Sequence, residues 1–111
     1  MFETTFSEYN IPILRVEGKL IGNTVDVLRR EMEKQIEQSN GRLILDLTNV
    51  PILDSSALGT IIAILQSIRN EDGKFILLKP QHAVMNVLKV TRLDTILEIY
   101  EDEEAALSAF N

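Results

Sequence analysis

The sequence of 111 residues contains no cysteine, no tryptophan and only one histidine. Without cysteine the chain forms no disulfide, has no thiolate nucleophile and offers no sulfur ligand to a metal ion. A single histidine also excludes a metal site built from several histidines of one chain. No glycine-rich phosphate loop is present either. We therefore expect no metal, no cofactor and no catalytic residue.

Long hydrophobic runs and basic clusters are missing as well. No apolar stretch approaches the roughly 20 residues that cross a bilayer. The start, MFETTFSEYN, lacks the basic residues and apolar run of a signal peptide. The formal net charge of -6 disfavours contact with nucleic acid and with anionic lipid. We expect a cytoplasmic protein that binds neither membranes nor nucleic acid.

The residues that are present indicate one globular domain. Hydrophobic residues make up 45% of the chain and charged residues 25%, which suits a core with an ordinary polar surface. The length is that of one domain. No linker rich in proline, glycine or serine divides the chain, so we expect a single domain over residues 1–111.

Apolar periodicity predicts alternating strands and helices. The predicted strands cover residues 2–7, 11–16, 43–47, 75–78 and 96–100. The predicted helices cover residues 24–39, 54–72, 82–90 and 102–110, with Thr24 as the first cap and Asp54 or Ser55 as the second. This order predicts an α/β fold with a mixed, mostly parallel sheet, an N-terminal β-hairpin and about four helices.

The predicted core consists of apolar residues on the inner faces of these elements. It comprises Leu14, Val16, Leu28, Met32, Leu43, Leu45, Leu47, Ile61, Leu65, Ile76, Leu78, Leu88 and Ile99. In sheets of this kind, binding sites lie beyond the carboxyl ends of the strands. The loops over residues 18–24 and 53–59 are therefore the first places to look for function.

The segment Leu53-Asp54-Ser55-Ser56-Ala57-Leu58-Gly59 follows a buried strand and opens a helix. Unpaired backbone N–H groups at a helix N-terminus favour a negative charge, so a phosphate on either serine can be accommodated there. Phosphorylation would turn a small, weakly polar surface into a strongly anionic one. A simple N-cap explains the same residues, and the two functions are compatible. The residues themselves do not distinguish Ser55 from Ser56.

Three other arrangements are weaker. His82 has no second histidine or cysteine beside it, and a surface or capping role suffices. A triad of Ser55, His82 and Asp94 lacks the G-x-S-x-G turn of a serine hydrolase. Asp46 lies inside a predicted strand, which does not suit a magnesium-binding phospho-acceptor cluster with Asp54. These arrangements give little support to a catalytic site, although a small enzyme that uses Ser55 stays open as an alternative.

The stretch Asp54-Ser55-Ser56-Ala57-Leu58-Gly59 closely resembles the D-S-S/T-G-L-G motif of the bacterial anti-sigma factor antagonists, the STAS-domain family. The resemblance extends over almost the whole chain. The Gly18 loop, the strand before Asp54, the strand over residues 74–77 and the segment over residues 87–94 follow in the family's order. The resemblance implies the STAS fold.

The resemblance also implies a function. In this family the first serine after the aspartate, here Ser55, is phosphorylated by the anti-sigma factor, an ATP-binding serine kinase, and a metal-dependent serine phosphatase reverses the reaction. The unphosphorylated antagonist binds the anti-sigma factor and the sigma factor is released. We expect phosphorylation at Ser55, with Ser56 as second choice. The expected partner-binding residues are Gly22, Asn23, Thr24, Asp54, Ser56, Ala57, Leu58 and Gly59.

The sequence departs from the family pattern at four positions. Lys19 and Ile21 replace the acidic residues of the first loop, Ala57 replaces a glycine after the serine pair, and Arg92 stands where the family often has glycine. The changes in the first loop leave an alternative open. The chain can instead be a constitutive scaffold module, as in a stressosome, that is never phosphorylated.

Overall fold

Five strands form one sheet in the computed structural model, which describes residues 1–110. The strands are β1 (Phe2–Phe6), β2 (Pro12–Glu17), β3 (Arg42–Asn49), β4 (Lys74–Leu78) and β5 (Glu98–Tyr100), and they lie in this order across the sheet. β1 pairs with β2 antiparallel, and all other neighbours pair parallel. The predicted mixed sheet with its N-terminal hairpin is confirmed.

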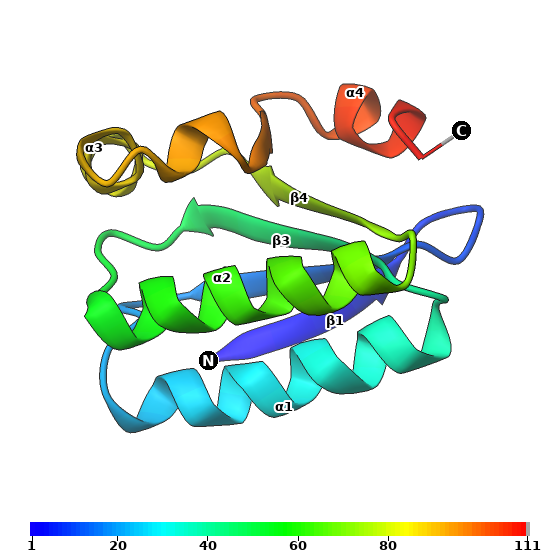
Figure 1. Ribbon diagram of the computed structural model, residues 1–111, viewed down its shortest axis with the longest axis horizontal. Coiled ribbons are helices and arrows are strands. Elements are labelled where there is room, and N and C mark those ends of the chain that lie inside the picture. Colours follow the sequence, from blue (N-terminus) through cyan, green and yellow to red (C-terminus); the bar gives the residue numbers. More distant parts are fainter. Residues whose placement is uncertain (111) are drawn as a thin grey trace.

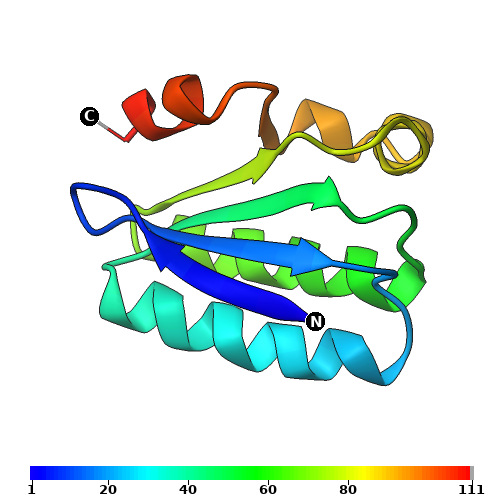
Figure 2. The same ribbon diagram turned by 180° about the vertical axis from the view of Figure 1, so that it is seen from behind.

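Helices cover both faces of this sheet. They are α1 (Asn23–Gln38), α2 (Ser55–Asn70), α3 (His82–Val90) and α4 (Glu103–Ser108), and a short 3-10 helix, η1 (Leu93–Thr95), follows α3. α1 and α2 run side by side along one face, and α4 lies over the other (Figures 1 and 2). The four predicted helices are confirmed, whereas η1 was not predicted. Within residues 1–110 none of the helices has the length and apolar character needed to cross a bilayer.

Alternation along the strands divides the core into two layers. Leu14, Leu45 and Leu77 are in register on neighbouring strands and belong to the larger cluster under α1 and α2. The adjacent residues on the same strands face α4 with Ala106 in a smaller cluster. All predicted core residues are buried except Ile99, which is half-buried because β5 is an edge strand.

The predicted boundaries lie within two residues of the observed ones, and two of the differences have a clear structural cause. Thr24 does not cap α1, since the helix begins one residue earlier with Gly22 at the N-cap position, and the Thr24 hydroxyl donates to the carbonyl of Ile21 (2.6 Å). β5 begins at Glu98 and not at residue 96, because the chain first turns through a left-handed residue, Arg92 (φ 63°), and then η1. Glycine adopts such a positive φ more readily than arginine does.

Candidate functional site

The two loops at the carboxyl ends of β2 and β3 are joined to each other by main-chain hydrogen bonds. The N–H of Leu20 donates to the carbonyl of Ile52 (3.0 Å), and the N–H of Asp54 donates to the carbonyl of Leu20 (3.1 Å). Leu20 and Leu53 form an isolated parallel bridge and are both buried. This contact anchors the first loop against the start of α2, as Figure 1 shows at the end of the sheet where α2 begins.

The carboxylate of Asp54 ties the same two loops together. Oδ1 accepts from the N–H of Ala57 (3.0 Å) and from the hydroxyl of Ser56 (2.7 Å), and Oδ2 accepts from the N–H of Gly22 (3.0 Å). These bonds, with that from Ser56 the strongest, lower the pKa of Asp54 to about 2, because all of them favour the ionised form. Asp54 is confirmed as the N-cap of α2 and is a carboxylate at neutral pH.

Gly22 makes this arrangement possible through its backbone. Its φ of 57° and ψ of -134° lie in a region that L-residues rarely adopt, and this conformation aims the N–H at Asp54. Asn23 and Thr24, which follow in the first turn of α1, are exposed. The structure thus brings the predicted loop residues and Asp54 to one surface.

The two serines at the start of α2 differ in their contacts. Both are exposed, but the Ser56 hydroxyl donates to Asp54, whereas the Ser55 hydroxyl has no hydrogen-bond partner within residues 1–110. Ser55 is the first residue of the helix, where backbone N–H groups lack intrahelical partners. Of the two, Ser55 therefore offers an unoccupied hydroxyl.

The next three predicted residues divide between core and surface. Ala57 is 3% exposed and packs in the main core, so a partner would reach only its backbone. Leu58 is half-buried. Gly59 is exposed, and a Cβ built on it meets no other atom within 4 Å. The helix thus presents a surface without a side chain one turn after Ser55.

Two exposed isoleucines lie in the two loops next to Asp54. Ile21 is 43% exposed and Ile52 is 47% exposed, and the bridge between Leu20 and Leu53 places them in adjacent segments. Lys19 is exposed in the same loop. The sequence prediction missed Ile52, although an apolar residue directly after Pro51 in a loop was a usable signal. The site therefore combines one carboxylate, two hydroxyls and an apolar margin.

The remaining candidates are not joined to this site. No hydrogen bond links Ser55, His82 and Asp94 within residues 1–110, and His82 is exposed. Asp46 is buried and pairs with Arg15 (2.9 Å), which also contacts Glu103 (2.8 Å). In the described part of the chain no group of three or more acidic or histidine side chains is placed to hold a metal ion.

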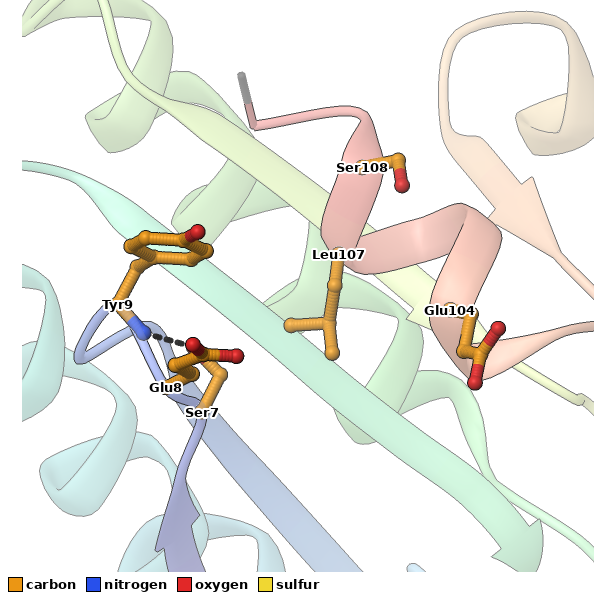
Figure 3. Close-up of a pocket in the computed structure, with 6 residues that line it drawn as sticks. All are labelled: Ser7, Glu8, Tyr9, Glu104, Leu107 and Ser108. Atoms are coloured by element: carbon orange, nitrogen blue, oxygen red, sulfur yellow. Dashed lines mark hydrogen bonds between the residues drawn. The ribbon is translucent and has the colours of Figure 1, made fainter.

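A hollow of about 260 Å³ lies at the opposite end of the sheet, between the turn that joins β1 to β2 and α4. Figure 3 shows Leu107 between Tyr9 of the turn and Glu104 of α4. The turn precedes the amino end of β2, whereas Ser55 follows the carboxyl end of β3. The hollow is therefore separate from the candidate site.

The α/β sheet thus carries an exposed serine, a capping aspartate and two exposed isoleucines at the carboxyl ends of its strands. The model of the STAS domain family matches residues 5–106. The chain belongs to this family. A relative from Paenibacillus polymyxa, the anti-sigma F factor antagonist, is 30% identical over 97 residues, which cover 86% of this chain and 83% of the relative.

Two Thermotoga proteins, provisionally named as anti-sigma factor antagonists, are 36% identical over 72 residues, or 65% of this chain. The matched segment spans 64% of their length. Among solved structures, the protein TM1081 has a TM-score of 0.85 and 28% identity, with 97% of this chain and 86% of that chain covered. The phosphorylated form of the Bacillus cell fate determinant SpoIIAA shares the fold, with a TM-score of 0.74, 21% identity and coverage of 98% and 99%.

Proposed function

We propose that the chain is an anti-sigma factor antagonist whose binding is controlled by phosphorylation of Ser55. The observation that carries this proposal is the exposed Ser55 hydroxyl at the first position of α2, which has no hydrogen-bond partner within residues 1–110. The names of the relatives support the antagonist function, and the existence of a phosphorylated SpoIIAA supports modification within this fold. The chain would be a substrate and a ligand, not an enzyme.

In this proposal the unmodified protein binds an anti-sigma factor in the cytoplasm, and the sigma factor is released. The anti-sigma factor is an ATP-binding serine kinase. The Ser55 oxygen attacks the γ-phosphorus of ATP, its proton passes to the solvent, and ADP leaves. A metal-dependent serine phosphatase hydrolyses the product. The contact surface comprises Gly22, Asn23, Thr24, Asp54, Ser56, Leu58 and Gly59, with Ala57 contributing through its backbone.

Charge explains how the phosphate would break this contact. Phosphorylation adds about -1.5 to -2 units of charge. Because the pKa of Asp54 is about 2, the phosphate joins a carboxylate that is already ionised. The N-terminal N–H groups of α2 stabilise the added charge, so the fold is kept while the surface becomes strongly anionic. A partner that covers this surface would have to desolvate the added charge, which is unfavourable.

The proposal is tested by the binding of charge variants to the anti-sigma factor of the same organism, measured by calorimetry. Ser55→Ala should bind like the wild type, and Ser55→Asp should bind at least about tenfold more weakly. Ser67→Asp is a matched control, since Ser67 is an exposed serine further along α2. Wild-type affinity of Ser55→Asp would contradict the mechanism.

A constitutive scaffold module is the second candidate. The exposed Lys19 and Ile21, at positions where the family carries acidic residues, favour a partner other than a kinase. This function predicts a large assembly in gel filtration with a partner from the same organism. It also predicts equal binding by Ser55→Ala and Ser55→Asp.

A further inference from the structure

Within residues 1–110, the outer edge of β1 is a row of backbone groups that no other strand pairs with. The N–H of Glu17 donates to the carbonyl of Met1 (2.9 Å), and the N–H of Ser7 donates to the carbonyl of Ile11 (3.0 Å). Hydrogen-bonded pairs alternate along an antiparallel ladder, so the odd-numbered residues of β1 bond to β2. The backbone N–H and C=O groups of Phe2, Thr4 and Phe6 therefore point outward.

This edge has few of the features that usually block strand addition. Natural edge strands carry charged residues (lysine above all), proline or a bulge, or they are very short. The one charged residue of β1 is Glu3. β1 has five residues, FETTF, pairs in unbroken register with β2 and contains neither lysine nor proline. Phe6 is 57% exposed at its end. The other edge of the sheet, β5, has only three residues.

We propose that β1 pairs antiparallel with β1 of a second copy of the chain, about a two-fold axis through Thr4. In this register Thr4 lies opposite Thr4 of the second copy, and Phe2 lies opposite Phe6 of the second copy. All three outward-facing residues of each strand then exchange backbone hydrogen bonds with their counterparts. The two five-stranded sheets become one continuous sheet.

The side chains of β1 favour a second copy of the chain as the partner of this edge. On the face toward α4, Glu3 of each copy lies opposite Thr5 of the other. The Thr5 hydroxyl accepts from Nε of Arg15 (3.2 Å), which leaves its own proton to donate to the carboxylate of Glu3 across the axis. A pairing centred on Glu3 would instead set two carboxylates opposite each other, which is unfavourable.

The arrangement has a consequence for the proposed function. Because the paired strands are antiparallel, the strand ends that carry Ser55 point in opposite directions in the two copies. The axis passes through the middle of β1, away from the loops that join Gly22 to Asp54. The dimer would therefore present two separate partner-binding surfaces. Dimerisation does not depend on Ser55, so failure of either proposal leaves the other standing.

Single cysteines test the register directly, since the chain has no cysteine of its own. In the proposed pair the Cα atoms of the two Thr4 residues lie about 5.5 Å apart, within the range of a disulfide. Those of the two Thr5 residues lie about 8 Å apart, which is too far. On mild oxidation, Thr4→Cys should form a covalent dimer much faster than Thr5→Cys, as read by non-reducing electrophoresis. Equal rates for the two variants would overturn the proposal.

Sedimentation equilibrium measures dimerisation of the protein without introduced cysteines. The wild type should show a monomer–dimer equilibrium, and Thr4→Pro, which removes an outward N–H, should weaken it at least about tenfold. Thr4→Val is the control, because it loses only the hydroxyl bond to Glu31 (2.7 Å) and keeps the backbone donor. A wild type that stays monomeric at millimolar concentration would overturn the proposal. If Thr4→Pro does not fold by circular dichroism, the cysteine pair decides.

Discussion

Replacement of Gly59 by alanine should raise the stability of the fold and weaken the binding of the partner. Gly59 is the fifth residue of α2, it is exposed, and an added Cβ would meet no atom within 4 Å. Alanine is favoured over glycine in a helix interior by about 0.8–1.0 kcal/mol. Because nothing in the fold opposes the methyl group, Gly59→Ala should raise the free energy of unfolding by nearly this amount. The melting temperature should rise by about 3–5 °C.

The same methyl group should impair partner binding. It projects from the exposed surface of α2 one turn after Ser55, within the proposed contact surface. We expect Gly59→Ala to bind the anti-sigma factor at least about tenfold more weakly while unfolding at higher temperature. Ser67→Ala, an exposed change on the same helix, should be slightly stabilising and should bind normally. Unchanged affinity of Gly59→Ala would refute a contact surface at this residue.

Three further predictions concern stability, measured by urea unfolding. The lowered pKa of Asp54 means that its ionised form stabilises the fold above the ordinary pKa of 3.8 and that this contribution is lost as the pH falls toward about 2. Asp54→Asn should therefore reduce the pH dependence of stability in this window, and an unchanged dependence would count against the hydrogen bonds assigned to Asp54. Gly73→Ala should destabilise by about 1–3 kcal/mol, because its Cβ would overlap the backbone of Gly41, and a wild-type value would argue against this close approach. Arg92→Gly should be neutral or stabilising by up to about 1 kcal/mol, because it relieves a left-handed residue; a clear loss of stability would show that the arginine side chain matters more.

Most of the fold could be predicted because its signals are local. The apolar run before Asp46 predicts a strand, and the periodic apolar residues of α2 predict a helix. Both patterns are visible within the segment itself. The end of the chain was harder. Ile96 reads as part of a strand, but the left-handed turn at Arg92 and the 3-10 helix after it place Ile96 outside the sheet. The positive φ of an arginine leaves no mark in a single sequence.

The sequence predicted which residues form the site, but not which hydrogen bonds join them. Asp54 is a plain N-cap signal, and its bond to Ala57 follows from that role. Its second oxygen, however, bonds the N–H of Gly22, which lies 32 residues earlier in the chain. Only the tertiary structure brings these groups together. From the sequence alone, Thr24 was therefore the better candidate for the N-cap of α1. The same bonds occupy Ser56 and leave Ser55 unoccupied, a difference that two adjacent serines cannot reveal in sequence.

The central claim is tested most directly by peptide mass spectrometry after incubation of the protein with ATP and the ATP-binding serine kinases of its source organism. A single phosphate on Ser55, absent from Ser55→Ala and retained in Ser56→Ala, is the predicted result. It would establish the switch and identify the kinase partner in the same experiment. Absence of phosphate with every kinase, or a phosphate on Ser56 alone, would contradict the proposed control through Ser55.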